Sequence, residues 1–574
     1  MKFIRKAALV VLALIIILCL WIWWNRPRKV DMTSYVPADS LIFIEANDLP
    51  DIANGLVSTD AWKALAPAAG IRSDLGHLGW LGRLASWTGI GSADAVVFSR
   101  AQIAVAVLGF DASGAGDALK IRPRYAVVAE THTGETRTRS AIEGRVGDFA
   151  RRAYGNPQVE QKEADGVKLT TWMSVDGERR IVAAVSGSVA IVGNDESAVQ
   201  ACLAVQRKDR PSLKGNPEVE EMRRRVSGTD ALAFGYASAE GAARLLELKA
   251  ITYAGQISAD PRAQSAAASL LPALARKILG RVGWSTRLYN GMIEDRYYVS
   301  LQAGVAEKLK SVMSPDSKAG FGAFELLPPN TQSTSRYSYS DPAATWRGLN
   351  TTVTSQFDTL GAILIGRLLR VSLTHYGIED PDTFMQAIGS ELVTANIDEQ
   401  ENSAVTVVEL RDEQTLRSFV TKRLGAKPRS EMIGDAEMLV SSNDKRDAAS
   451  FVGKHLLLGK VEAVRRCLEA RLNGQTLGNS DSFRKSQSSL GAGAALVVQF
   501  YDDQPSASSF VRAIAAQKAI SDQALNGAKL NEALGGLRYA FSETQLVDRG
   551  FERKTRSSFG QFGLLATQFT PPDN

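Results

Sequence analysis

The most pronounced hydrophobic pattern in the chain is an apolar run near its N-terminus. Residues 7–24 contain no charged residue and no proline. At a helical rise of 1.5 Å per residue this length spans roughly 27 Å, close to the hydrocarbon core of a bilayer. Trp21, Trp23 and Trp24 end the run, where the headgroup layer favours their rings. We therefore predict a transmembrane anchor with basic flanks over residues 1–30.

Two alternatives to a retained anchor lack the small residues that they require. Signal peptidase cleaves after small residues, but the apolar run ends in Trp-Trp-Asn-Arg-Pro. Cys19 follows Ile17 and Leu18, which are too bulky for the residue expected before a lipidated cysteine. The sequence thus favours an anchor that is neither cleaved nor lipidated.

The flanking charges leave the orientation of the anchor open. Lys2, Arg5 and Lys6 precede the run and Arg26, Arg28 and Lys29 follow it, so the two sides tie. A short leading segment before a long domain favours an N-terminus inside the cell. We expect a single pass through the cytoplasmic (inner) membrane with an extracytoplasmic, periplasmic body. Only two cysteines lie beyond the run, which suits either compartment.

Beyond the anchor, a glycine-bracketed strand followed by an apolar helix occurs twice. Residues 187–193 (GSVAIVG) and 453–459 (GKHLLLG) are short apolar runs between glycines, a pattern typical of a buried strand. Each leads to AVxxCL with helical apolar spacing, which contains Cys202 in the first copy and Cys467 in the second. These thiols could form one disulfide across equivalent helices, but two separate buried thiols are favoured.

Three further stretches recur in the same order. A proline-containing entry to a strand and helix begins at Val36 and Leu327, with Asp48 and Asp341 expected to cap the helix and Pro342 at its first position. A strand and an RSxxxxR helix follow at residues 127–146 and 407–424. The last stretch is a hairpin with an Asn290-Gly291 turn, in which Asp295-Arg296 is matched with Asp548-Arg549 on the following strand.

The order of these elements predicts an α+β fold made of two tandem duplicated units. Strands linked by turns, with interspersed helices, indicate antiparallel or mixed sheets covered by helices. The expected units are residues 31–313 and 325–560, joined by a linker at 314–324. Residues 561–574 are expected to form a flexible tail.

The repeated motifs resemble a bacterial envelope family known as domain of unknown function 3352. The resemblance rests on VPADSLIFIEAN after the anchor, LPPNT at the start of the second copy, and the glycine-bracketed strand with AVxxCL. It covers most of the chain after Met32 and implies a single-anchor protein with repeated α+β segments. The family's LPADT-type opening is altered in both copies, to VPADS at 36–40 and PPNT at 328–331. The resemblance implies no catalytic or binding residues.

Composition and charge argue against nucleic-acid binding. The chain has 45% hydrophobic and 22% charged residues, as globular proteins do, and a net charge of only +5. The densest basic run, Arg223–Arg225, is interpreted as a solvated helix face.

No catalytic, cofactor-binding or metal-binding residues are predicted. None of the four histidines has a second His or Cys at ligand spacing: His77, His132, His375 and His455. His455 replaces Val189 in the bracketed strand, which favours a structural role. Gly459-Lys460 lacks the spacing and hydroxyl of a phosphate loop. Ser482 and Lys485 form S-x-x-K without its usual companion motifs, and the acidic residues around Pro381 indicate a helix start.

The sequence predicts a membrane-anchored, non-enzymatic module for binding or envelope assembly. Its expected partners are the membrane, through residues 7–24, and a protein or envelope component. An envelope hydrolase with an unrecognised site and an accessory subunit of a transport or secretion complex are the alternatives.

Overall fold

The described residues of the computed structural model fold into two compact units. The described ranges are 27–46, 49–71, 92–113, 120–228, 231–257, 261–316, 320–374, 378–399, 403–425, 427–442, 446–491, 495–515 and 526–563. Unit 1 takes its described residues from Met1–Ser58, Ile71–Ser238 and Gly283–Leu288, and unit 2 from Thr59–Gly70, Ala239–Val282 and Tyr289–Asn574. The predicted anchor, residues 7–24, lies outside these ranges. Among the helices described, none is long and apolar enough to cross a membrane.

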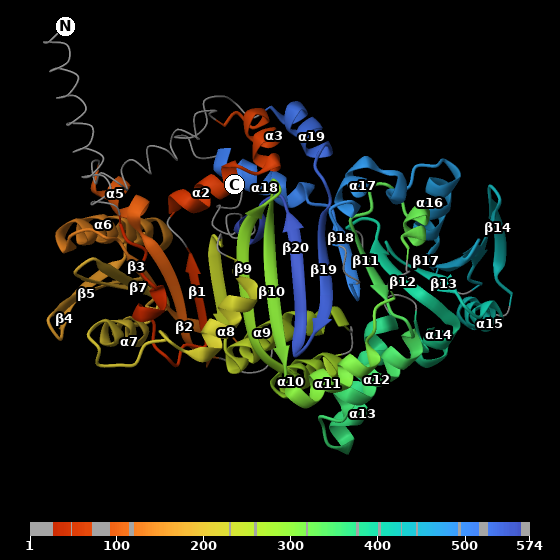
Figure 1. Cartoon of the computed structure of the whole chain (residues 1–574), viewed down its shortest axis with the longest axis horizontal. Coiled ribbons are helices and arrows are strands. Elements are labelled where there is room, and N and C mark those ends of the chain that lie inside the picture. Colours follow the sequence, from red (N-terminus) through yellow and green to blue (C-terminus); the bar gives the residue numbers. More distant parts are fainter. Residues whose placement is uncertain are drawn as a thin grey trace, which may run out of the picture. The chain divides into compact units, whose positions relative to one another are not determined.

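The elements of unit 1 alternate between strands and helices (Figure 1). They are η1 (Met32–Tyr35), β1 (Ile42–Ala46), α2 (Leu49–Val57), α5 (Ala93–Arg100), β2 (Gln102–Ser113), β3 (Lys120–Glu130), α6 (Glu135–Tyr154), β4 (Gln158–Ala164), β5 (Val167–Met173), β6 (Arg180–Ser186), β7 (Val189–Gly193), α7 (Glu196–Gln206), α8 (Pro217–Val226) and β8 (Ala233–Ala237). These strands pair antiparallel, in the order β8-β1-β2-β3-β7-β6-β5-β4.

Unit 2 contains a longer antiparallel sheet. Its elements are α3 (Asp60–Ala68), α9 (Ala239–Ile257), α10 (Pro261–Ile278), β10 (Met292–Leu301), α11 (Ala303–Val312), η3 (Gly322–Leu326), β11 (Ser333–Ser338), α12 (Pro342–Thr354), α13 (Thr359–Thr374), α14 (Pro381–Ala387), β12 (Ile388–Asn396), β13 (Ala404–Leu410), α15 (Glu413–Leu424), β14 (Arg429–Ile433), β15 (Ala436–Val440), β16 (Asp447–Val452), β17 (His455–Lys460), α16 (Val461–Leu472), η4 (Leu477–Asn479), α17 (Asp481–Gln487), β18 (Val497–Tyr501), α18 (Gln504–Ala515), α19 (Gly527–Gly535), β19 (Ala540–Val547) and β20 (Gly550–Ser557). β9 (Leu279–Tyr289) contributes residues to both units.

The strands of unit 2 repeat the pairing order of unit 1. The order β18-β11-β12-β13-β17-β16-β15-β14 matches β8-β1-β2-β3-β7-β6-β5-β4 strand for strand. In unit 2 the sheet continues from β18 through β19 and β20 to β10. The prediction of an α+β fold with antiparallel sheets is therefore confirmed.

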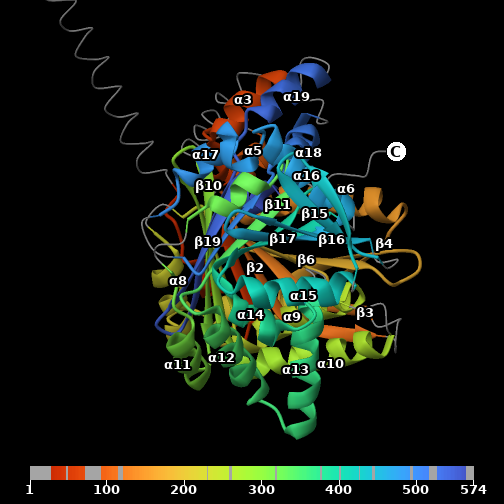
Figure 2. The ribbon, with the colours of Figure 1, turned by 90° about the vertical axis from the view of Figure 1, so that its right-hand side faces the viewer.

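Each sheet lies between two layers of helices because its apolar residues alternate in direction. In unit 2, Val393 and Val407 belong to a core with α16 and η3, whereas Leu392 and Val408 belong to a core with α12, α14 and α15. Figure 2 shows α16 and α15 on opposite faces of β16 and β17. In unit 1, α6 and α7 cover opposite faces of β3 and β7 (Figure 1).

The two glycines that bracket each repeated strand serve different purposes. The first, Gly187 or Gly453, has φ of 61° or 57° in the hairpin turn before the strand, a conformation that glycine adopts without strain. The second lies under the following helix. A Cβ on Gly193 would be 2.7 Å from the Tyr125 carbonyl oxygen and 2.9 Å from Val199, so a larger residue would collide with both.

Helix capping agrees with the sequence where it is described. Asp341 accepts a hydrogen bond from the Ala344 amide, and Pro342 is the first residue of α12. Asp380 caps α14 in the same way before Pro381. Asp48 lies outside the described residues. Cys202 and Cys467 are buried free thiols, so the favoured interpretation is confirmed.

One predicted correspondence is wrong. Asn290 and Gly291 have the positive φ values, 49° and 75°, of the expected two-residue turn between β9 and β10. Asp548-Arg549, however, forms the turn between β19 and β20, whereas Asp295-Arg296 lies within β10. The repeated Asp-Arg pair is a coincidence of composition, because the two pairs occupy different positions in their hairpins.

The ends of the predicted linker and tail are ordered parts of unit 2. The linker was expected at 314–324, but Gly322 begins η3, and Phe324 is fully buried. The tail was expected from residue 561, but the Gln561 amide donates to the Asp295 carboxylate at 3.1 Å. A short sequence rich in small and polar residues does not reveal such tertiary contacts. Residues 564–574 lie outside the described ranges.

Candidate ligand-binding site

A large open cavity of about 1080 Å³ lies in unit 1 between α6 and one face of the sheet. The sheet contributes apolar residues from β3, β6 and β7, among them Val127, Ile181 and Val192. Phe98 of α5 and Ile142 and Val146 of α6 extend this apolar surface. The volume is slightly above the usual range of small-molecule sites, about 300–1,000 Å³.

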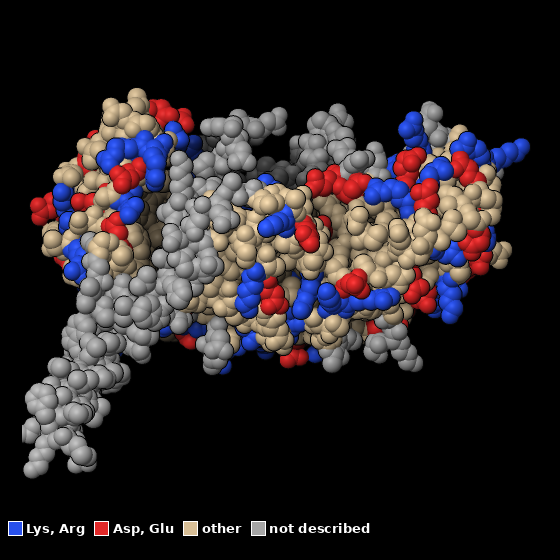
Figure 3. Space-filling view, turned by 90° about the horizontal axis from the view of Figure 1, so that it is seen from above, with Lys and Arg blue, Asp and Glu red and all other residues tan. Residues whose placement is uncertain are grey.

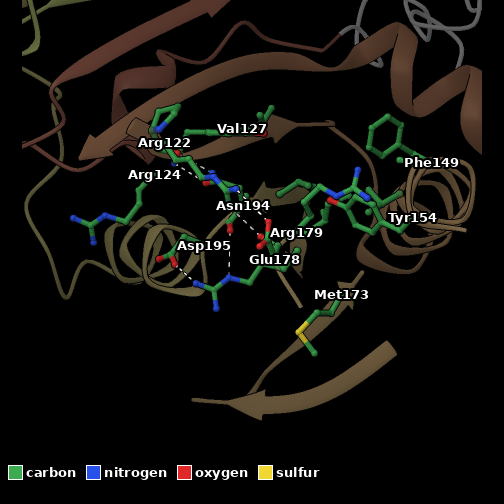
Figure 4. Close-up of a pocket in the computed structure, with 18 of the residues that line it drawn as sticks. Arg122, Arg124, Val127, Phe149, Tyr154, Met173, Glu178, Arg179, Asn194 and Asp195 are labelled. Carbon is green, nitrogen blue, oxygen red and sulfur yellow. Dashed lines mark hydrogen bonds and ion pairs between the residues drawn. The ribbon is translucent and has the colours of Figure 1, made fainter. Parts of the chain in front are cut away.

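The last turns of α6 form one wall of the cavity. α6 continues for more than two turns beyond Arg145, to Tyr154, and Gly155 ends the helix with a φ of 74°. These turns carry Phe149 and Tyr154 along one side of the cavity (Figure 4). The side chain of Phe149 is 52% exposed, a high fraction for a phenylalanine. The corresponding helix of unit 2, α15, ends at Leu424.

Arginines surround the apolar surface. The five that line the cavity are Arg122, Arg124, Arg145, Arg179 and Arg180. Three of them pair at the rim: Arg145 with Asp94, at 2.5 Å, Arg122 with Glu178, at 3.7 Å, and Arg124 with Asp111, at 3.2 Å. Figure 4 shows Arg124 extending away from the other labelled side chains. Since these pairs are more than one-third exposed, water screens them and their charges stay available to a ligand.

Asn194 and Asp195 organise the polar side of the cavity after β7. The Asn194 amide bridges the strand below it, accepting from the Tyr125 amide at 3.0 Å and donating to the Pro123 carbonyl at 2.7 Å. Asp195 caps α7 and pairs with Arg180. Burial would raise the pKa of Asp195, but hydrogen bonds from Ser197 and the charge of Arg180 hold it below its ordinary value.

Arg179 and Tyr154 form the far rim. The Arg179 guanidinium lies 5.0 Å from the centre of the Tyr154 ring, a cation–π contact. Among the described residues, Arg179 forms no ion pair. Burial raises the pKa of Tyr154, and the charge of Arg179 opposes this. The far rim is therefore aromatic and cationic at once.

Residues that the sequence singled out lie elsewhere. His455 is in β17, with Nε2 3.7 Å from the Glu391 carboxylate, and His132 is in a turn with its Nε2 3.1 Å from Gln102. Arg223 of α8 pairs with Glu45 at 2.9 Å. His77 and His375 lie outside the described residues. The arginines of the cavity were not recognised as a group because they come from a helix, two strands and a turn, which only the tertiary structure brings together.

In the part of the chain that the structure describes, neither surface charge nor a cluster of metal ligands marks a second site. On the face drawn in Figure 3, basic and acidic side chains are interspersed. Within the described ranges, no group of three or more His, Cys, Asp or Glu side chains could hold a metal ion. Comparison of the chain with protein-family models, curated proteins and solved structures found no match.

Proposed function

We propose that the chain is a membrane-anchored, extracytoplasmic binding protein whose unit 1 holds a ligand with an apolar portion. The observation that carries this proposal is the cavity under α6, with its apolar floor and exposed Phe149. Burying apolar ligand surface there gains roughly 25 cal/mol per Å² before the costs of association. We assign the chain no reaction: its role is to bind the ligand.

The apolar run at residues 7–24 supports the membrane-anchored part of the proposal. A tether holds unit 1 near a bilayer, where molecules with an apolar chain are abundant. The resemblance to an envelope family and the shared strand order of the two units support the further proposal that the body arose by duplication.

Binding is tested with eight-carbon amphiphiles on the full chain reconstituted in nanodiscs. Octyl phosphate, octanoate and 1-octanol are titrated calorimetrically, and empty discs correct for partition into the bilayer. We expect saturable binding of at least one probe. The exposed Ala153 lines the cavity, so Ala153→Trp should fill it and weaken binding by about tenfold or more.

The matched control is Thr136→Trp, at an exposed position of the same helix that does not line the cavity. It should bind like the wild type. Absence of saturable binding for all three probes, or equal affinity in both tryptophan variants, would contradict the proposed function.

Orientation is tested by labelling a single introduced thiol in intact cells. Val175, 72% exposed in the turn between β5 and β6, is changed to Cys in a chain that carries Cys19→Ser. Cys202 and Cys467 are buried and should stay silent. An extracytoplasmic body predicts labelling by a membrane-impermeant maleimide before lysis. Labelling only after lysis would reverse the proposed topology.

A further inference from the structure

The space under α6 is open in unit 1. In unit 2 the equivalent space, under α15, is filled by a buried cluster of ion pairs. Strand register identifies the equivalent residues: Val182 pairs with Gly193 in unit 1, and Ala448 pairs with Gly459 in unit 2. The residues before them, Ile181 and Asp447, therefore occupy equivalent positions. The residues after the two glycines, Asn194 and Lys460, are equivalent as well.

Asp447 is held by two cations from the surrounding elements. Its carboxylate lies 2.8 Å from Lys460 Nζ and 3.2 Å from the guanidinium of Arg423 on α15. The side chain of Asp447 is only 4% exposed and that of Arg423 only 10%. A buried carboxylate persists because such partners replace its lost hydration.

Unit 1 keeps the helix arginine but lacks the carboxylate. The repeated RSxxxxR segment makes Arg145 of α6 equivalent to Arg423 of α15. Ile181 replaces Asp447, so Arg145 lacks the partner that Arg423 has and instead pairs with Asp94 at the rim, where it is 60% exposed. Ile181 and Arg145 both line the cavity.

We infer that the ligand of unit 1 is an acidic amphiphile, with a carboxylate or phosphate head that contacts Arg145 where unit 2 has the Asp447 carboxylate. Its apolar chain lies along Val146 and Phe149 of α6. The counterpart of α6 in unit 2, α15, ends at Leu424 and lacks these last turns. This inference rests on the proposed function and adds the chemical class of the ligand and the place of its charge. Asp94 is a partner that the head group can replace, since that pair is exposed and screened.

The first test compares probes that share a chain and differ in charge. For the full chain in nanodiscs, octyl phosphate and octanoate should bind about tenfold or more tightly than 1-octanol, as a charge-assisted contact predicts. Arg145→Gln should remove this preference and leave the affinity for 1-octanol unchanged. Arg145 is exposed, so the variant should fold. Arg152→Gln, at an exposed position of the same helix that does not line the cavity, is the matched control and should keep the preference.

The second test installs the acid of unit 2 in unit 1. Ile181→Asp should weaken octyl phosphate binding much more than Ile181→Asn, which has similar volume and no charge. The inference is overturned if the three probes bind equally, if Arg152→Gln acts as strongly as Arg145→Gln, or if the Asp and Asn variants behave alike. In each case probe binding by the wild type would leave the proposed function standing. No binding of any probe would remove both.

Discussion

Buried charges in unit 2 are neutralised across strands that are distant in sequence. Glu294 of β10 is fully buried, and its two carboxylate oxygens each accept from an arginine Nε at 2.8 Å, Arg296 on one side and Arg556 of β20 on the other. The Arg556 guanidinium also lies 4.6 Å from the centre of the Tyr289 ring. Forming such a cluster costs free energy because the charges lose their hydration. Removing any one member costs stability because it leaves a buried charge without its partner.

We therefore predict that Glu294→Gln destabilises the protein by about 3 kcal/mol, because two arginines lose their buried counter-charge. Thermal unfolding of the full chain measures the change. The control, Glu413→Gln, removes an exposed partner of Arg417 and should cost less than about 1 kcal/mol. Equal shifts in the two variants would show that the cluster carries no special stability.

The two buried thiols give a prediction about reactivity. Burial raises the pKa of Cys202 and of Cys467 to about 12. Because the thiolate is the reactive form, a Cys19→Ser chain should react with a thiol reagent only on unfolding. Its native labelling should not increase between about pH 7 and pH 9, well below the raised pKa. Rapid native labelling would contradict the burial of both residues.

At the scale of elements, the repeated strand and helix depend on a glycine where the two approach each other. A Cβ on Gly459 would lie 3.0 Å from the Ala404 carbonyl oxygen and 3.4 Å from Val464, the counterparts of Tyr125 and Val199 in unit 1. At this glycine α16 packs directly on the strand backbone. Neither neighbour can therefore move away without disturbing the packing.

Gly193→Ala should accordingly destabilise the protein by about 1–3 kcal/mol, the usual cost of overpacking. Gly144 in α6 provides the opposite case. It is exposed, and a Cβ there would meet nothing within 4 Å. Gly144→Ala should stabilise the chain by about 1 kcal/mol through helix propensity alone. Denaturation midpoints of the two variants should move in opposite directions, and a shared direction would refute this account.

At the scale of the whole molecule, the two units share a strand order, but we expect only unit 1 to bind the ligand. Hydrogen exchange of the full chain in nanodiscs should show octyl phosphate slowing exchange in the second half of α6 and in the turn between β5 and β6. Exchange in α15 and β16, where Asp447 already holds the position, should be unchanged. Equal protection of both units would contradict the assignment.

Much of the fold was predictable because it depends on local patterns. The strand at Val189–Gly193 and the helix after it follow from glycine positions and apolar spacing, which act over a few residues. Asp341 and Pro342 mark a helix start for the same reason. The false match of Asp548-Arg549 arose because a dipeptide does not specify its place in a hairpin, whereas strand register does.

The cavity could not be predicted from the sequence because it is a space between a helix and a sheet that no side chain fills. Ile181 and Arg145 are ordinary residues of a strand and a helix, and their spacing in sequence does not indicate that they line one space. The sequence by itself determined the apolar run, the α+β class and the recurrence of motifs, since these depend on periodicity along the chain. Tertiary structure alone decided that one copy is filled by Asp447 and the other is open, because register and helix length set the space between a helix and its sheet.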